Sequence, residues 1–408
     1  MRADPMLAPE LLYYLAFALY FFAVVLGRTT LEDFLFVPID DAIDALQAVV
    51  LLLLLCKFVF QRAPLSSWVL AAALVLVDFI SWRQSAEGWL FWLALFVVCG
   101  EGVRLRPLAA ISLVMSLTTV LVATSLASMG FVEDVVSSRA GVVRHAMGFS
   151  HPNSLGLYLL SACVSFSVLR FGKNPLPDIL LIGVADAVNL AVADSRSTVL
   201  LSFVQVLLLL VFYTVKSERG RGVARAGICA GVLAVFALSM YLMVAYDASS
   251  GWQSSLNQLL SGRLNLAHSY YEMQPLTLFG SSFEGFEPIY WENGEPVAFL
   301  VDNAWCHLVL RYGVVPTACL LTGMFLLFKR LVTRRRWDAL LFGLTLMAVY
   351  GFTETYGIRI ECNYFLFALG AELLYGPRAA RGAQSGRNKA WEGLPAKPPA
   401  AARAGAGE

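Results

Sequence analysis

The chain has 408 residues, of which 58% are hydrophobic and only 14% are charged, and its mean hydropathy is +0.68. Soluble domains are typically about 45–50% apolar and about 25% charged, so this composition excludes a soluble cytosolic enzyme and a secreted disulfide scaffold. Thirty Lys and Arg residues against 29 Asp and Glu residues leave a net charge of +1, which offers no electrostatic basis for binding nucleic acid. The sequence therefore predicts an all-α polytopic membrane protein.

Apolar stretches close to the roughly 20 residues that a helix needs to cross a bilayer recur along the chain. Hydropathy predicts twelve spans, at residues 10–27, 42–60, 65–81, 88–100, 107–129, 153–169, 176–193, 196–215, 226–246, 302–328, 338–354 and 361–376. The first span is followed by Arg28-Thr29-Thr30 and by no small-residue cleavage site. We therefore interpret it as a membrane helix and not as a removed signal peptide.

The distribution of basic residues predicts the orientation of these spans. Basic clusters such as Lys216–Arg225 and Lys329–Arg336 fall in alternate loops, and the positive-inside rule places such loops in the cytoplasm. Both chain ends are therefore predicted to be cytoplasmic. The membrane domain, residues 1–376, then carries its largest outer loop at about 247–301, before the tenth span. Residues 377–408 are rich in Ala, Gly, Pro and Arg and are predicted to form a disordered cytosolic tail.

Polar clusters stand where helices are predicted to begin on the outer side. At the sixth span, Arg144-His145 is followed by His151-Pro152-Asn153-Ser154-Leu155-Gly156. Pro152 fits the first turn of a helix, whose free N–H groups and dipole favour a phosphate there; an ordinary capped helix start explains the same residues. At the eighth span, Asp194-Ser195-Arg196-Ser197 places a cation against the helix dipole. Arg196 therefore needs an anion, which Asp194 could supply.

Two further clusters lie in and after the large outer loop. Gly262-Arg263-Leu264-Asn265 lies within it, and Asp302-Asn303 opens the tenth span. Asn303, His307 and Arg311 follow at i, i+4 and i+8 and are predicted to share one face of one helix. His307 and Arg311 would lie about 6 and 12 Å below the helix start, which is costly in a membrane unless they face a polar cavity or a partner.

Structural roles are the alternative for several of these residues. Arg311 could form an ion pair with Glu354 or Glu361, and Asp186 and Asn189 in the seventh span favour a structural polar pair. The seven cysteines lie mostly in apolar runs and show no metal-ligand spacing. We interpret them as small core residues.

Four of these motifs occur in an order that resembles the O-antigen polymerase and O-antigen ligase family (Wzy/WaaL-type). They are His151-Pro152-Asn153-Ser154-Leu155-Gly156, Ser195-Arg196-Ser197, Gly262-Arg263 and Asp302-Asn303. Nine residues separate Asn303 from Gly313, which is similar to the ligases' motif of histidine, a small polar residue, nine residues and glycine. The large loop before the tenth of twelve helices is also similar, and the likeness extends from about Arg144 to Pro316. Asp302 stands where the ligases carry histidine, which favours the polymerase branch.

The resemblance implies a GT-C-like glycosyltransferase in the bacterial inner membrane, with its active site on the outer side. Its substrates would be a polyprenyl-diphosphate-linked oligosaccharide donor and acceptor, joined into O-antigen, capsule or exopolysaccharide. A flippase and a chain-length regulator are the family's usual partners. No cofactor or metal is predicted, because the outer loops contain no DxD pattern and arginines can take the place of a metal as charge stabilisers.

This chemistry assigns roles to the candidate residues. Stabilising the leaving diphosphate suits arginine, whose planar fork matches phosphate oxygens, and Arg196 and Arg263 are the first choices. Asp302 is the candidate base for the acceptor hydroxyl, with His151 or His307 as alternatives. The candidate catalytic residues are Asp302, Arg196, Arg263 and His151, and the candidate substrate-binding residues are Arg144, Asn153, Asn303, His307 and Arg311.

Two other functions remain open. A ligase would transfer glycan to a lipid, a protein or the cell wall. An ion-coupled transporter would use Asp186, His307, Arg311 and Glu354 as a relay. The polar residues gather near the outer ends of the predicted spans and not along their whole length, which favours the enzyme.

Overall fold

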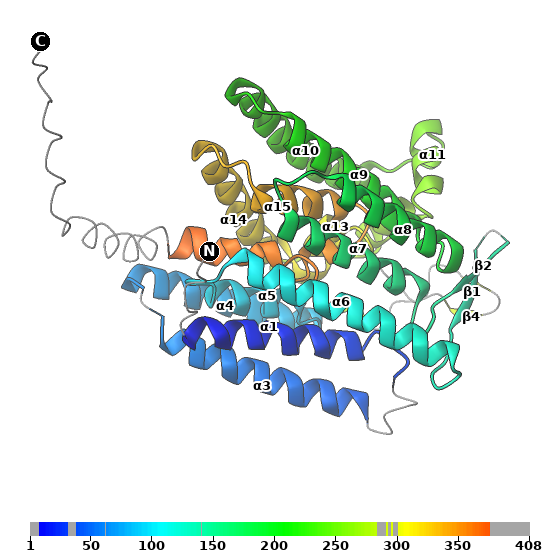
Figure 1. The fold of residues 1–408 in the computed structure, drawn as a ribbon, viewed down its shortest axis with the longest axis horizontal. Coiled ribbons are helices and arrows are strands. Elements are labelled where there is room, and N and C mark those ends of the chain that lie inside the picture. The colour runs from blue at the N-terminus through cyan, green and yellow to red at the C-terminus, as the bar shows by residue number, and fades with distance from the viewer. Residues whose placement is uncertain are drawn as a thin grey trace, which may run out of the picture.

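The structure, a computed structural model, describes residues 8–31, 38–61, 63–139, 141–283, 291–292, 295–296 and 301–375. Within these residues, eight helices are long and apolar enough to cross a membrane by length and composition. They are α1 (Ala8–Leu26), α3 (Ile39–Val59), α4 (Leu65–Ser85), α6 (Leu105–Ser128), α7 (Pro152–Arg170), α9 (Arg196–Thr214), α10 (Glu218–Ala245) and α14 (Val314–Thr333) (Figure 1). The expectation of an all-α membrane protein is confirmed, and each long helix overlaps one predicted span.

The other four predicted spans form shorter elements. They are α5 (Trp89–Val98), α8 (Leu176–Val192), α15 (Ala339–Tyr350) and the C-terminal turns η3 (Tyr364–Leu366) and η4 (Leu369–Leu374). α5 has 10 residues and α15 has 12, which correspond to about 15 and 18 Å at 1.5 Å per residue. The hydrocarbon core of a bilayer is about 30 Å thick. The count of twelve spans therefore stays a prediction.

The described residues also include two small antiparallel hairpins. β1 (Val136–Arg139) pairs with β2 (Val142–His145), and β3 (Trp291–Glu292) pairs with β4 (Glu295–Pro296). The helices α11 (Gly251–Leu259) and α12 (Arg263–Met273) form much of the segment predicted as the large outer loop. Residues 284–290, 293–294 and 297–300 of that loop lie outside the described residues, and so does the predicted tail at 377–408.

A core of large aromatic side chains lies between α1, α5, α7 and the C-terminal turns. Phe17 of α1 contacts Phe96 of α5 and Tyr364 of η3 edge to face, with ring centroids 6.2 Å apart in both pairs. Phe21 packs on Tyr158 of α7. All five rings are buried, so the first, middle and last parts of the chain share one core.

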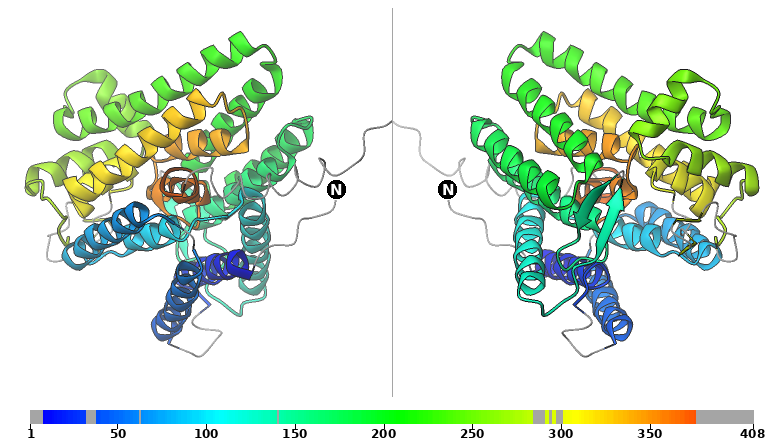
Figure 2. Two further views of the ribbon diagram at one scale, coloured as in Figure 1. Left: turned by 90° about the vertical axis from the view of Figure 1, so that its left-hand side faces the viewer. Right: turned by 90° about the vertical axis from the view of Figure 1, so that its right-hand side faces the viewer.

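The helix ends form two groups at opposite ends of the bundle. At one end, Lys57 near the end of α3 donates to the carbonyl of Glu101 after α5, and Arg225 in the first turns of α10 donates to the carbonyl of Arg335 after α14. The hairpin β1–β2 and α11 lie at the other end, which faces the viewer in the right-hand view of Figure 2. The loops with the basic clusters therefore share one end.

The tenth predicted span is interrupted. α13 (Ala304–His307) is followed by a π-helical turn, η1 (Leu308–Tyr312), and α14 begins only at Val314. Gly313 between them has a φ of +90°, and a Cβ at this position would lie 2.3 Å from the backbone nitrogen of Gly280. Only glycine fits such a conformation and such a close approach. The prediction of one continuous helix over residues 302–328 is therefore wrong.

Candidate functional site

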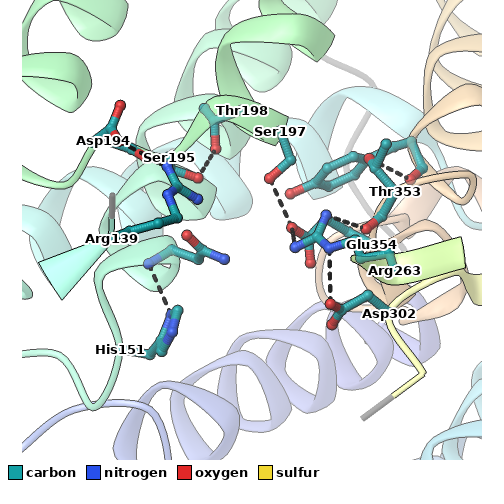
Figure 3. Close-up of polar contacts among 12 residues, drawn as sticks. Arg139, His151, Asp194, Ser195, Ser197, Thr198, Arg263, Asp302, Thr353 and Glu354 are labelled. Carbon is teal, nitrogen blue, oxygen red and sulfur yellow. Dashed lines mark hydrogen bonds and ion pairs between the residues drawn. The ribbon is translucent and has the colours of Figure 1, made fainter. Parts of the chain in front are cut away.

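Candidate residues from five separate segments meet at the end of the bundle that carries the hairpin. Arg144 lies in β2, His151 precedes α7, Arg196 begins α9, Arg263 begins α12, and Asp302 precedes α13. Figure 3 shows two facing groups of side chains, one around Asp194 and the other around Arg263. The first group includes Arg139 and Asp194, which the figure labels, and also Arg196 and Arg144, which lie near Asp194. We name these four residues the basic group, and we name Arg263, Asp302 and Glu354 the carboxylate bridge.

The carboxylate bridge is held together by the guanidinium group of Arg263. Its Nε lies 2.8 Å from Oδ2 of Asp302, and its Nη2 lies 2.7 Å from Oε1 of Glu354. Its Nη1 donates to the carbonyl of Thr353, and the hydroxyl of Ser197 donates to Glu354 at 2.7 Å. All three nitrogens of Arg263 are therefore bound within the protein. The bridge carries two carboxylates for one cation.

Local conformation places Arg263 at this point. Gly262, the residue before α12, has a φ of +86°, a left-handed conformation that glycine adopts without steric cost. Burial by itself disfavours the charge of Arg263, but Glu354 and then Asp302 outweigh it and raise the pKa of the guanidinium group. Arg263 is therefore a fixed cation that anchors both carboxylates.

The environment of Asp302 raises the pKa of its carboxyl group to about 6. Burial is the largest cause; Arg263 opposes it, and the charge of Glu354 adds to it. The side chain keeps 30% of its surface exposed, so a substrate can reach it. A carboxylate with this pKa is ionised at pH 7 and is still basic enough to accept a proton. Asp302 is therefore suited to general base catalysis.

The basic group holds more cations than anions. Nη2 of Arg139 lies 2.8 Å from Oδ2 of Asp194, and Nε of Arg196 lies 3.7 Å from the same oxygen. The side chain of Arg196 is 52% exposed, so its guanidinium group is open to a ligand. The anion that was expected from Asp194 is present, but it is shared between two arginines.

Arg144 forms no ion pair with a carboxylate of the described residues. Its Nε donates to the carbonyl of Ala193 at 2.8 Å, and its Nη2 donates to Oδ1 of Asn153 at 2.6 Å. Burial is the main cause that lowers the pKa of Arg144 to about 10, and Arg139 is the next. An added anion would stabilise such a guanidinium group. We therefore interpret the basic group as a candidate site for a phosphate or diphosphate.

His151 is the N-cap of α7, and Pro152 takes the first helical position, as predicted. Nδ1 of His151 accepts a hydrogen bond from the backbone N–H of Asn153 at 3.1 Å. The proton of the neutral imidazole is therefore assigned to Nε2. Desolvation, followed by the charge of Arg144, lowers the pKa of His151, so the ring is neutral at pH 7. This geometry favours a hydrogen-bond donor over a base.

His307 and Arg311 face a carboxylate that was not singled out in the sequence. Nε2 of His307 lies 2.7 Å from Oε2 of Glu87, and the Nε of Arg311 lies 3.4 Å from the same oxygen. Asn303 instead donates to Ser239 and caps α13 with its Oδ1. His307 and Arg311 therefore meet at one carboxylate oxygen, whereas Asn303, which precedes α13, does not share this contact.

Arg311 pairs with neither of the two carboxylates that were expected for it. Glu354 belongs to the carboxylate bridge, and Oε1 of Glu361 lies 3.6 Å from the guanidinium group of Arg28. Arg311 pairs with Glu87, in the turn between α4 and α5. No sequence spacing relates two residues so far apart in the chain. The sequence feature that could have indicated Glu87 and Glu354 is their position, since each is an acidic residue at the outer end of an apolar stretch.

Among the residues that the structure describes, no group of three or more His, Cys, Asp or Glu side chains is placed to hold a metal ion. Comparisons of the chain with protein-family models, with curated proteins and with solved structures find no match. Its function is therefore inferred from the geometry of the basic group and the carboxylate bridge.

Proposed function

We propose that this protein is a membrane glycosyltransferase. It joins polyprenyl-diphosphate-linked oligosaccharide repeat units into a cell-surface polysaccharide at the outer leaflet of a bacterial inner membrane. The observation that carries the proposal is the placement of two complementary groups opposite each other. Asp302 is a partly exposed carboxylate with a pKa of about 6, and the facing basic group has an excess of positive charge.

In the proposed reaction, Asp302 takes the proton of the acceptor hydroxyl as that oxygen attacks the anomeric carbon of the donor glycan. The bond between this carbon and the diphosphate oxygen breaks, and its electron pair leaves with the polyprenyl diphosphate. Arg144 and Arg196 stabilise the charge that develops on the diphosphate, and Nε2 of His151 supplies a further donor. No metal ion takes part.

Arg263 takes a different role from the one first considered for it. Its contacts with Asp302, Glu354 and Thr353 leave no nitrogen without a partner, and two carboxylates beside it would repel a diphosphate. We therefore assign Arg263 as a positioning residue, which holds the base, and we assign the diphosphate to Arg144 and Arg196.

The test is reconstitution of the purified protein in liposomes with a polyprenyl-diphosphate-linked repeat unit and EDTA, followed by gel analysis of glycan length. We expect a ladder from the wild type and a rate about 100- to 1,000-fold lower from Arg144→Gln, since removing one electrostatic donor has effects of this size. Arg83→Gln is the matched control, because Arg83 is an exposed arginine in the last turn of α4. A normal ladder from Arg144→Gln would contradict the assignment.

The same assay separates the alternatives. Absence of a ladder, with glycan transfer once a lipid or protein acceptor is added, would favour a ligase. Inertness in both formats would favour an ion-coupled transporter. A relay through His307, Arg311 and Glu354 receives little support from the contacts, because the first two pair with Glu87 while Glu354 pairs with Arg263.

A further inference from the structure

A large apolar groove lies away from the candidate site, between α4, α5, α14 and η4. Its volume is about 1020 Å³. α4 and α14 lie on either side of the C-terminal turns in the left-hand view of Figure 2. Leu70, Val314 and Leu326 line the groove and are 50%, 42% and 44% exposed. The groove therefore opens sideways, toward the hydrocarbon that would surround a membrane-spanning bundle.

One end of the groove is positively charged. Lys329, Arg330 and Arg334 line it at the C-terminal end of α14, about 20 residues or 30 Å from the Gly313 break that adjoins the site end. Glu372 lies 3.3 Å from Arg330, 2.9 Å from Arg334 and 3.4 Å from Arg336, so three arginines share one carboxylate, and Lys329 adds a further cation. This end belongs to the face that the positive-inside rule places in the cytoplasm.

The acidic residue of the groove lining lies far from this end. Asp78 follows Leu65, the first residue of α4, by 13 positions, or about 20 Å along the helix. The start of α4 is at the basic end, because the hydroxyl of Ser67 donates to the carbonyl of Leu374. The charge of the groove is therefore divided, and an anionic head group is favoured at one end only.

We propose that this groove binds an anionic phospholipid of the inner leaflet. Its phosphate would lie beside Lys329, Arg330 and Arg334, whose combined positive charge exceeds the charge of Glu372, and its acyl chains would fill the apolar groove. The argument for this occupant is complementarity, since basic pockets between membrane helices on the cytoplasmic side attract anionic head groups. The arginine fork matches phosphate oxygens, and the side chain of Arg334 is 37% exposed. This site is independent of the proposed glycosyl transfer.

The test is lipid retention by the full-length protein. The protein is reconstituted in vesicles of equal parts dioleoyl phosphatidylglycerol and dioleoyl phosphatidylcholine, extracted in a non-ionic detergent, and analysed by native mass spectrometry. We expect the wild type to retain phosphatidylglycerol in preference to phosphatidylcholine. Arg330→Gln/Arg334→Gln should lower this retention about 30-fold, or roughly fivefold for each charge removed.

Two further variants separate the groove from general surface charge. Lys216→Gln/Arg219→Gln removes two exposed cations near the start of α10, at the same end of the bundle, and should leave retention unchanged. Thr322→Trp fills the groove without a change in charge and should lower retention of the lipid. Equal retention of both lipids by the wild type would overturn the proposal. So would an equal loss in the control variant, or unchanged retention in Thr322→Trp.

Discussion

Replacing Arg263 with Gln tests the carboxylate bridge. The substitution removes the cation that lies 2.8 Å from Asp302 and 2.7 Å from Glu354. Removing one partner of a buried ion pair costs about 3–5 kcal/mol, because the other charge is left uncompensated. The side chain of Glu354 is 6% exposed and that of Asp302 is 30% exposed. Water can solvate Asp302, so we expect the free energy of unfolding to fall by about 3 kcal/mol, at the low end of this range.

The loss should depend on pH. Burial keeps the pKa of Asp302 at about 6 even beside Arg263, and removing Arg263 raises this pKa further. The pKa of Asp302 in the folded state lies above the value near 4 that it has in the unfolded chain, so protonation of Asp302 stabilises the folded state. This contribution is complete below about pH 4 and is lost as the pH rises through about 6. The loss in Arg263→Gln should therefore be larger at pH 8, where Asp302 is ionised, than at pH 5, where it is largely protonated.

The measurement is the free energy of unfolding by SDS titration in mixed micelles, at pH 8 and at pH 5. The double variant Arg263→Gln/Glu354→Gln also removes the charge of Glu354, the more buried of the two carboxylates, and keeps an acceptor for Ser197. It should therefore recover about 1–2 kcal/mol of the unfolding free energy that Arg263→Gln loses. Arg83→Gln is the surface control and should stay within about 0.5 kcal/mol of the wild type. The bridge is refuted if Arg263→Gln loses less than about 1 kcal/mol at pH 8, or if the double variant is no more stable than the single one.

Two further predictions concern the reaction. The transfer rate should rise with pH around an apparent pKa of about 6, because Asp302 must be ionised to accept a proton; a flat profile between pH 5 and pH 7 would contradict this role. His151→Asn should keep the cap of α7 and most of the stability, whereas His151→Ala should cost about 1 kcal/mol of unfolding free energy. Both variants should transfer glycan more slowly, since both lack the Nε2 donor, and a wild-type rate in either would show that His151 only caps the helix.

The membrane class and the long helices could be predicted because they depend on local sequence. About 20 apolar residues are enough to identify a spanning helix, and all eight long helices overlap predicted spans. The tenth span shows the limit of hydropathy. Apolar residues continue on both sides of Gly313, but the break depends on its positive φ and on its contact with Gly280. The segment that carries Gly280 reaches it only through tertiary packing.

Several residues of the candidate site could be predicted from the sequence, but Arg139 and Glu354 were not among the predicted site residues, and the pairing of the charges could not be predicted. His151, Arg196 and Arg263 stand at helix starts, where polar residues in a membrane protein gather at the surface. Their partners could not be predicted, because each charged helix end has several oppositely charged residues available to it. Glu354 was considered for Arg311 and pairs with Arg263 instead.

The sequence by itself determined that the protein is helical and apolar, and it indicated which polar residues gather at one end of the bundle. Only the tertiary structure decided which arginine is paired with carboxylates of the protein and which one can bind an anionic ligand. Arg263 is bound by two carboxylates, whereas the acceptors of Arg144 among the described residues are the carbonyl of Ala193 and the amide oxygen of Asn153, which are neutral. The physical reason is that the energy between charges varies with their separation and with the surrounding dielectric. Both quantities are set by how distant segments pack and not by their order in the chain.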